Sequence, residues 1–417
     1  MKKVLIIAYH FPPEEGSCSD KNIKIIKVLK DAGLKVEVLT VGESSNEEYY
    51  ENVPIFRAKG GIFHRKKNIG ECNNLTDVCT KGEVKAHIKA LGEVKAHIKD
   101  FVQKKIVPDS IIDWYPNVIR WSKNNLERMK SYGVILSISS PYSVHLISNH
   151  LSKKYNIPYI CSYGDPWIYE PARKRGKLRY KFEYQLEKKI VTEASKILVI
   201  TNYNRKKYMS LYGISEDKID TFNIGYDSHM LKERKVYREG KIRFIYGGSL
   251  NPIHRNVVPF IHAVHNLDGI IVDIYNQDYP ELKPIIEKLG ISKKVNVQNL
   301  ISSSKFTDEL YNSDVLLLFG NKTVFQVPGK LFDYISTGAH VLYIKNNMGI
   351  DDASEHILRK YGNVTIVDNN VESILLSLID ICNKYRTKTL NSVCNKDEYE
   401  SHITMKSIVE AVRSVLK

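Results

Sequence analysis

Short apolar segments alternate with helix-forming segments along nearly the whole chain of 417 residues. Most of these apolar segments are continuous and do not alternate with polar residues. Continuous apolar strands separated by helices are typical of parallel sheets that helices cover on both faces. The predicted strands are residues 3–9, 35–41, 134–140, 157–163, 197–201, 242–248, 269–275, 295–298, 313–319, 340–344 and 363–367. The sequence therefore predicts the α/β class, with doubly wound parallel sheets.

The length of the chain indicates two domains, because a single core rarely grows beyond about 250–300 residues. Residues 223–240 separate the two groups of predicted strands, are polar and charged, and lack apolar periodicity. We interpret them as a hinge between residues 1–222, which carry an insertion at 60–108, and residues 241–396. We expect the last segment, 397–417, to form a helix that packs back on the first domain. Such sheets bind ligands at the carboxyl ends of their strands, so we expect the two domains to face each other across a cleft.

The charge of the chain indicates an anionic partner. There are 62 Lys and Arg residues against 47 Asp and Glu residues, a formal net charge of +15. Such a surplus favours nucleic acid, an acidic membrane surface, or phosphorylated small molecules. The sequence contains no helix-turn-helix, zinc-finger or RNP pattern, so we expect no nucleic-acid partner.

The beginning of the chain resembles a secretion signal only briefly, because His10 and the pair Pro12-Pro13 follow the short apolar stretch at once. A first β-strand is the better interpretation. No apolar run approaches the ~20 residues that a membrane-spanning helix needs. Six cysteines are widely spaced without a C-x2-C pair, which favours free thiols. We therefore expect a cytoplasmic protein.

A tandem repeat interrupts the strand–helix rhythm. Residues 82–89 and 92–99 are the same octapeptide, Gly-Glu-Val-Lys-Ala-His-Ile-Lys. As one helix, the repeat has an apolar stripe flanked by lysines. One hypothesis is that residues 82–105 form a basic amphipathic helix on an anionic membrane surface, which would place the protein peripherally on the inner face of the plasma membrane. The other is an ordinary helix that covers the first domain.

Three positions in the first half are candidates for a site, and two of them directly follow predicted strands. Gly16 precedes a helix, and a glycine there lets the backbone approach a ligand while the helix N-terminus faces an anion. Asp165 lies at the end of strand 157–163 and is followed by Pro166. It is a candidate base for an acceptor hydroxyl, with a turn aspartate as the alternative. His145 is a second candidate in the same half, with a structural role as its alternative.

The second half contains a glycine turn and a cation. Gly248 and Ser249 end the strand 242–248, and Arg255 follows a few residues later, before a predicted helix. A glycine turn at the end of a strand allows close approach of a ligand to the backbone. Arg255 would add a positive charge beside that turn.

The segment Val327–Gly338 carries the most specific pattern. Pro328 and Gly329 are expected to open a helix whose N-terminus attracts phosphate. Lys330 in the first turn opposes the helix dipole, a cost that an anionic ligand would explain. Asp333 lies one turn further on the same face, where it could accept hydrogen bonds from ribose hydroxyls. The alternative is an ordinary helix start with a solvated lysine.

Taken together, these segments resemble a glycosyltransferase of the GT-B fold and of the family 4 type, as found in capsule, O-antigen and exopolysaccharide synthesis. The resemblance implies two doubly wound Rossmann-like domains and covers nearly the whole chain in family order, apart from residues 60–108. The matching stretches are Tyr9–Pro13 with Gly16, Asp113-Trp114, Ser139–His145, Gly164–Trp167, Asn223–Asp227, Gly247–Ser249 with Arg255, and Val327–Tyr334.

The resemblance also implies roles for the candidate residues. Gly16 would line the cleft beside donor and acceptor, Asp165 takes the place of the family's aspartate near the acceptor, and His145 would contact the transferred sugar. Arg255 and Lys330 would neutralise the diphosphate as the glycosidic bond breaks. The implied donor is a UDP- or GDP-linked sugar, and the implied acceptor is a glycan or a lipid-diphosphate-linked glycan.

Two positions depart from the family pattern. Asp333 stands where the family usually has a ribose-binding glutamate, and Phe325 stands where many relatives have the first acid of an E-x7-E motif. The chain has no D-x-D pair to hold a divalent metal, so we expect metal-independent transfer. The resemblance favours retention at the anomeric carbon.

Two other functions are compatible with the same fold. A sugar-nucleotide epimerase would need additional acid–base carboxylates, and the sequence offers no convincing set. A catalytically silent partner subunit that binds glycan or lipid is favoured by Phe325 and Asp333, whereas Arg255 and Lys330 argue against it.

Overall fold

The structure is a computed structural model of the chain. It describes residues 2–64, 106–170, 173, 175–234, 240–252, 254–276, 278–346, 352–391 and 393–416. The repeat at 82–99, and with it the predicted membrane helix at 82–105, lies outside these residues. The described residues form two compact units, and each is considered by itself. The first unit falls within Met1–Leu198, Tyr212–Asp220 and Val409–Lys417, and the second within Val199–Leu211 and Thr221–Ile408. The predicted domain boundaries and the cleft stay predictions.

The first sheet has eight strands in the order β3-β4-β2-β1-β5-β6-β7-β8. The strands from β4 through β2, β1 and β5 to β6 pair in parallel, and β3 pairs antiparallel with β4. Their bounds are β1 Lys3–Ala8, β2 Val36–Gly42, β3 Asn46–Tyr50, β4 Val53–Lys59, β5 Tyr132–Ile138, β6 Tyr159–Tyr163, β7 Lys196–Val199 and β8 Ile219–Thr221. The predicted parallel strands of this half are therefore present.

The sequence analysis missed β3, β4 and β8. The β3 strand has the sequence Asn-Glu-Glu-Tyr-Tyr and lies largely exposed at the edge of the sheet, so it lacks the continuous apolar signal of a buried strand. It joins β4 through Glu51 and Asn52, which both have positive φ, as a two-residue hairpin turn requires. The β8 strand has three residues, too short for a sequence pattern.

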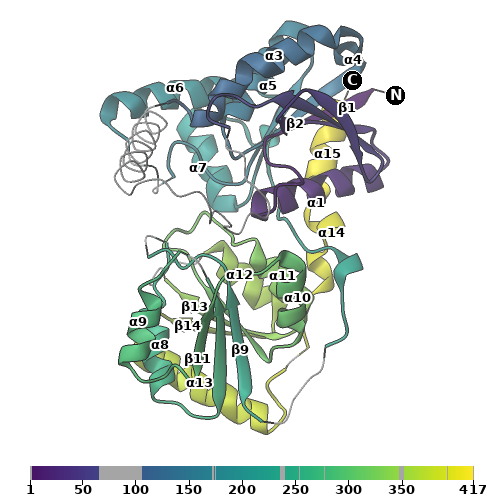
Figure 1. Cartoon of the computed structure of the whole chain (residues 1–417). Coiled ribbons are helices and arrows are strands. Elements are labelled where there is room, and N and C mark those ends of the chain that lie inside the picture. The colour runs from purple at the N-terminus through teal and green to yellow at the C-terminus, as the bar shows by residue number, and fades with distance from the viewer. Residues whose placement is uncertain are drawn as a thin grey trace, which may run out of the picture. The chain divides into compact units, whose positions relative to one another are not determined.

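The helices associated with the first sheet follow its strands in sequence. They are α1 (Ser17–Asp31), α3 (Tyr115–Asn124), α4 (Leu126–Ser131), α5 (Ser143–Tyr155) and α6 (Lys177–Glu193), whereas α7 (Asn202–Tyr212) falls almost wholly in the second unit. Near the C-terminus, α14 (Ser401–Thr404) leads into α15 (Lys406–Val415). The end of α15 belongs to the first unit, where the Arg413 guanidinium donates a 2.7 Å hydrogen bond to the carbonyl of Ala32 just after α1 (Figure 1).

The second sheet has six strands in the order β11-β10-β9-β12-β13-β14, and all neighbouring pairs are parallel. Its strands are β9 Ile242–Gly247, β10 Ile270–Tyr275, β11 Val295–Gln298, β12 Val315–Phe319, β13 His340–Lys345 and β14 Val364–Asp368. Its helices are α8 Val258–His265, α9 Leu282–Lys288, α10 Ser303–Tyr311, α11 Lys330–Ser336, α12 Ala353–Tyr361 and α13 Val371–Arg386. Each of its strands was predicted, and the α/β class with two parallel-dominated sheets is confirmed.

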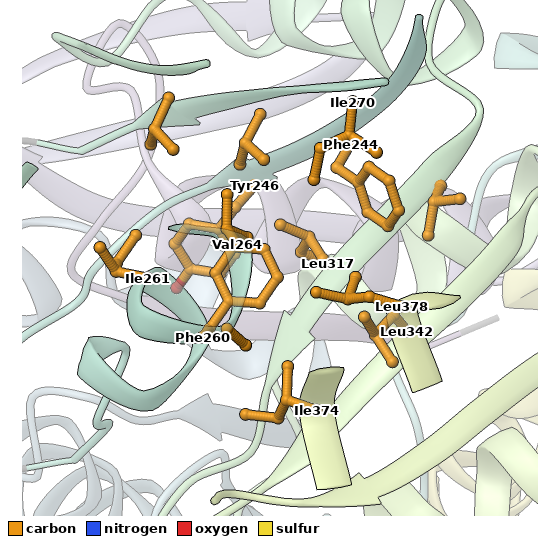
Figure 2. Close-up of a cluster of buried hydrophobic side chains, with 14 of the residues drawn as sticks. Phe244, Tyr246, Phe260, Ile261, Val264, Ile270, Leu317, Leu342, Ile374 and Leu378 are labelled. Atoms are coloured by element: carbon orange, nitrogen blue, oxygen red, sulfur yellow. The ribbon is translucent and has the colours of Figure 1, made fainter. Parts of the chain in front are cut away.

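Both faces of the second sheet are buried. Along β12, Leu317 packs in one apolar cluster, whereas the adjacent Leu316 packs in another, because successive side chains point to opposite faces. The first cluster joins the sheet to α8, α9 and α13, and the second joins it to α10, α11 and α12 (Figure 1). Figure 2 shows the first cluster, in which Phe244 of β9 and Phe260 of α8 are both fully buried.

This burial requires apolar residues at most strand positions of the second unit. Its parallel strands all point the same way, so the loops that follow them meet at one edge of the sheet. Among the described residues, no helix is long and apolar enough to cross a lipid bilayer.

The two-sided core predicts a large difference between two leucines of the second unit. Leu317 is fully buried in β12, whereas Leu376 on α13 is 62% exposed. We expect Leu317→Ala to lower the free energy of unfolding by about 2–5 kcal/mol, since the substitution leaves a cavity. The matched control Leu376→Ala should change it by less than about 0.5 kcal/mol. Urea unfolding of the intact chain measures both, and equal effects would contradict the assignment of this core.

Candidate functional site

Lys330 and the glycine turn after β9 lie together at the carboxyl edge of the second sheet. Lys330 is the first residue of α11, and Gly329 occupies the N-cap position. The Lys330 Nζ donates to the carbonyl of Gly247 at 2.6 Å and to the hydroxyl of Tyr246 at 2.9 Å. It also lies 4.0 Å from the centre of the Tyr246 ring, a cation–π distance. The lysine is thus folded back onto the end of β9.

Gly248 leaves room for the Lys330 side chain where it passes the turn. Its φ of 125° is disfavoured for residues with a side chain, and an added Cβ would collide with the Lys330 Nζ. The turn is held by Asp278, whose carboxylate accepts from the Ser249 hydroxyl and, at 2.8 Å, from the backbone N–H of Leu250. Burial raises the pKa of Asp278, but these hydrogen bonds outweigh it and hold the pKa below its usual value. A charged carboxylate therefore fixes the loop that faces the lysine.

Arg255 provides a second cation at the same turn. Its Nη1 donates to the carbonyl of Ser249 at 2.9 Å and its Nε to the carbonyl of Phe319 at 3.2 Å. Burial lowers the pKa of Lys330 well below its usual value, and the positive charge of Arg255 adds to this effect. In the part of the chain that the structure describes, neither cation forms an ion pair with a carboxylate. Two cations held by backbone carbonyls are arranged to receive an anion.

Two of the N–H groups at the start of α11 already have partners. The helix is seven residues long. The N–H groups of Leu331 and Phe332 already donate to the carbonyls of Pro328 and Gly329, at 3.0 and 3.2 Å. Asp333 is exposed in the first turn, one turn after Lys330. The positive charge at this edge therefore comes mainly from the two side chains.

A cavity of about 380 Å³ adjoins Arg255. Its walls carry a second cation, Lys322, and several neutral amides. The lining residues are Pro252, Arg255, Asn256, Val257, Tyr279, Lys322, Asn346 and Asn369. These residues come from the loops after β9, β10, β12, β13 and β14. A cavity of this size and polarity can hold a hydroxylated, negatively charged group.

Phe325 is committed to apolar packing. It is 8% exposed, and its ring stacks on Tyr203 of α7 with 6.1 Å between ring centres. Its carbonyl accepts a 3.0 Å hydrogen bond from the side chain of Asn204. An acid that would stand here in many family 4 relatives is therefore replaced by a ring held against a helix.

In the first unit, Asp165 is carried by a rigid loop directly after β6. The carbonyl of Pro166 accepts from the Tyr142 hydroxyl at 2.8 Å. The buried Trp167 stacks on Tyr142 with 5.3 Å between ring centres, and its Nε1 donates to Glu183 at 2.9 Å. Asp165 itself is partly exposed. The loop thus presents the carboxylate at the edge of the sheet with its backbone fixed on both sides.

His145 is fully buried in the first turn of α5. Its Nδ1 lies 2.8 Å from the Ser137 hydroxyl, and its ring packs 4.3 Å from the centre of the Tyr163 ring. Burial lowers the pKa of His145 to about 3, and the charge of Lys21 adds to the shift. The imidazole is therefore neutral at physiological pH. Its Nε2 is buried without a hydrogen-bond partner.

Gly16 is the N-cap of α1, with a φ of 132° that favours glycine. Five residues later, Lys21 is 7% exposed and donates a 2.6 Å hydrogen bond to the carbonyl of Ser139. Sequence reasoning missed Lys21. It is one of several lysines on α1, and the sequence gives no signal that separates it from the others.

Within each unit, the structure brings predicted residues together. In the second unit Gly248, Ser249, Arg255 and Lys330 form one cluster. In the first unit the charge of Lys21 acts on His145, and Lys21 also lies against Gly164, next to Asp165. Among the described residues there is no group of three or more His, Cys, Asp or Glu side chains placed to hold a metal ion.

Comparison with known proteins identifies the fold. No protein-family profile matches the sequence, and no curated protein is significantly similar to it. Solved structures match over nearly the whole length. Sucrose-phosphate synthase from Thermosynechococcus elongatus has a TM-score of 0.67 at 10% identity, covering 99% of this chain and 98% of that one. HepE from Anabaena, in complex with UDP and glucose, has a TM-score of 0.65 at 10% identity, covering 99% and 100%.

A third match is WaaG, a glycosyltransferase involved in lipopolysaccharide biosynthesis, with a TM-score of 0.60 at 11% identity, covering 98% of this chain and 99% of that one. At these identities the likeness lies in the fold. The chain has the GT-B fold, with two Rossmann-like domains, as the resemblance in sequence predicted.

The contact between Gly248 and Lys330 predicts a steric coupling. Gly290 also has positive φ, but an added Cβ there meets nothing within 4 Å. We expect Gly290→Ala to cost about 1 kcal/mol of stability from its backbone conformation. Gly248→Ala should cost more, because a φ of 125° is less accessible to alanine and because the Lys330 ammonium must give up its hydrogen bonds to Gly247 and Tyr246. In a Lys330→Ala background the part of this cost that comes from the lysine, about 1 kcal/mol, should disappear. Urea unfolding of the four variants measures this, and an additive double variant would show that the two residues do not meet.

The depressed pKa of His145 predicts a pH effect on stability. An unfolded histidine has a pKa of about 6.5. Between this pH and about pH 3, the unfolded chain binds a proton at this position and the folded chain does not. Folding stability therefore falls as the pH drops through this window. At pH 5 this site should cost about 2 kcal/mol relative to pH 7.5, and His145→Gln should remove that cost. Urea unfolding at both pH values tests it, with the exposed His262→Gln as control; the same pH profile in wild type and His145→Gln would refute it.

Proposed function

We propose that this chain is a glycosyltransferase that transfers a sugar from a nucleotide diphosphate sugar to a glycan or lipid-linked acceptor. The observation that carries the proposal is the pair of cations at the end of β9. Lys330 and Arg255 converge on the Gly247–Ser249 turn and are held by backbone carbonyls. Among the described residues no carboxylate forms an ion pair with either of them, although Asp278 and Asp333 are close enough to act on the pKa of Lys330. A diphosphate is the anion that such a pair suits best.

The two cations have a catalytic purpose in this proposal. As the glycosidic bond breaks, negative charge develops on the diphosphate leaving group, and preorganised cations stabilise it. Burial and the repulsion from Arg255 lower the pKa of Lys330. A bound diphosphate would raise this pKa and favour the ammonium form. The side chains thus supply the charge that a metal ion supplies elsewhere, and we infer metal-independent transfer.

The solved relatives support a UDP-linked donor. HepE has been crystallised with UDP and with UDP-glucose. We infer that the diphosphate binds at Gly248, Ser249 and Gly329, and that Asp333 contacts the ribose from the exposed first turn of α11. The cavity of about 380 Å³ beside Arg255 offers room for part of the donor.

The acceptor is assigned to the first unit. Asp165 is the proposed base for the acceptor hydroxyl, and the fixed loop that carries it supports this role. Gly16 would line the site, and neutral His145 would accept a hydrogen bond from a sugar hydroxyl through its Nε2. WaaG acts in lipopolysaccharide biosynthesis, which supports a role in a bacterial surface polysaccharide. We expect retention at the anomeric carbon and a cytoplasmic site of action, peripheral to the plasma membrane.

One alternative has a specific observation in its favour. Phe325 is buried against Tyr203 and leaves the position of the usual sugar-contacting acid without a carboxylate. A catalytically silent partner subunit would tolerate this replacement. Such a subunit would have no need of two unneutralised cations, which is why we favour the enzyme.

Loss of either cation should weaken donor binding. Lys330→Ala and Arg255→Ala are each expected to reduce the affinity for UDP by about 10- to 100-fold, since each removes a charge-assisted hydrogen bond of about 1.5–3 kcal/mol. Hydrolysis of the sugar nucleotide should fall at least as much. Calorimetric titration with UDP-, GDP- and CMP-linked sugars, together with a hydrolysis assay, measures both effects.

The control is Lys283→Ala, an exposed lysine on α9 in the same unit. It should bind UDP as the wild type does. Wild-type protein that binds none of these nucleotides would exclude the proposed enzyme, whereas nucleotide binding without turnover would favour the silent partner subunit.

A further inference from the structure

Lys21 is a buried cation that the donor site does not use. It lies on the second turn of α1 and is 7% exposed, in contrast to the exposed Lys30 on the same helix. Its Nζ donates to the carbonyl of Ser139 at 2.6 Å, just beyond the carboxyl end of β5. In the described part of the chain no carboxylate pairs with it. An ammonium group has three N–H donors, so a buried ammonium with one carbonyl partner can still donate two more hydrogen bonds.

The Lys21 ammonium lies beside Gly164, which has no side chain to cover it. A Cβ added to Gly164 would lie 2.9 Å from the Lys21 Nζ and 3.5 Å from the Ser139 carbonyl oxygen. Gly164 directly follows β6 and precedes Asp165. The ammonium therefore lies against bare backbone at the edge of the sheet, next to the residue proposed as the base.

His145 gives a second, independent sign of a ligand at this edge. The Ser137 hydroxyl lies 3.1 Å from the carbonyl of Ile160 and 2.8 Å from the His145 Nδ1, and its single hydrogen can go to only one of them. In the tautomer whose Nδ1 donates to Ser137, the Nε2 is an acceptor. That Nε2 is fully buried and unpartnered, and the charge of Lys21 is close enough to lower the pKa of the imidazole. Buried polar atoms without partners are rare in native proteins and call for an explanation.

The first turn of α1 contributes a further unpartnered group. The Ser19 hydroxyl, two residues before Lys21, is buried and has no hydrogen-bond partner. The helix begins at the Gly16 N-cap without a side-chain cap. A cation, a glycine-opened helix start and unpartnered polar groups thus occur in one segment of α1 and the strand ends beside it.

We propose that Lys21 is the cationic centre of a phosphate-binding subsite in the first unit, separate from the cations of the second unit. The subsite rests on the proposed function in one respect: the phosphate belongs to one of the two substrates. It is either a phosphate of the donor or the diphosphate of a lipid-linked acceptor. In both cases the Lys21 ammonium binds a phosphate oxygen beside Gly164, and the His145 Nε2 accepts from a hydroxyl of the same ligand.

A purely structural role for Lys21 makes a different prediction. If the ammonium served only to hold the Ser139 carbonyl, its loss would lower stability and leave phosphate affinity unchanged. Lys30 provides the matched comparison, because it donates a 2.7 Å hydrogen bond to the backbone carbonyl of Glu51 but is exposed.

The test is calorimetric titration of the full chain with inorganic pyrophosphate, UDP and a short-chain isoprenyl diphosphate. The Lys21→Met variant keeps the length of the side chain and removes the charge. We expect at least a 10-fold loss of affinity for pyrophosphate in a Lys330→Ala background, where the second unit contributes least. Lys30→Met in the same background should retain it. A thermal melt of each variant checks that it folds.

The remaining titrations identify the source of the phosphate. Weaker UDP binding in Lys21→Met assigns the subsite to the donor, and weaker isoprenyl diphosphate binding with unchanged UDP binding assigns it to the acceptor. If Lys21→Met does not fold, Gly164→Ala replaces it, since the new methyl group occupies the space beside the ammonium and should weaken the same ligand. Unchanged affinity for all three ligands would overturn the subsite. Because pyrophosphate needs no sugar nucleotide, this result is distinguishable from failure of the proposed function.

Discussion

The need to bury both faces of a parallel sheet determines where this molecule can place polar chemistry. Apolar burial is worth about 25 cal/mol per Å², and the strands of the second unit contribute to a separate apolar cluster on each face. A charge in mid-strand would lose its solvation without a partner. Asp273 in β10 is accordingly paired with Arg243 of β9, and the cations without a carboxylate partner among the described residues lie in loops at the carboxyl ends of the strands, which all point the same way. Lys330, Arg255 and Asp165 all lie at such ends.

The buried charged groups Glu183, Lys330 and Lys21 differ in whether their hydrogen-bond partners are charged or neutral. Glu183 is fully buried; burial raises its pKa, but hydrogen bonds from Arg179 and Arg175 outweigh this and lower it. That group is neutralised within the protein and fixes the loop of Trp167. Lys330 and Lys21 instead donate only to neutral oxygens. A charge paired inside the protein stabilises the structure, whereas a cation held by neutral oxygens at a strand end keeps most of its potential for a ligand.

The sequence was sufficient for the parts of the molecule that local pattern controls. Continuous apolar runs located most buried strands of both sheets, but not β4, whose apolar run is interrupted by Pro54 and Arg57. The charged edge strand Asn46–Tyr50 was missed because it is not buried on both faces. The Gly329–Lys330 helix start was predicted from its own residues and order. Lys21 could not be found in this way, since it is one of several lysines on α1 and differs from Lys30 only in burial. Its environment is made by Ser139 and Gly164, which are more than a hundred residues away, and no local period encodes that approach.

Phe325 stands where the resemblance in sequence implies an acid, and this replacement affects the electrostatics of the second unit. Its ring is held on Tyr203. In the same loop Asn321 donates to Gln326 at 3.4 Å, and the Lys322 ammonium donates to the carbonyl of Pro252 at 2.8 Å. A carboxylate at position 325 would place a negative charge in the loop that leads to Lys330 and would compete for its ammonium. With a phenyl ring there, the amides of Asn321 and Gln326 are the groups of this loop that could both donate to and accept from sugar hydroxyls. In the proposed enzyme, affinity for the donor would then depend more on the diphosphate and less on the sugar than with an acid at this position.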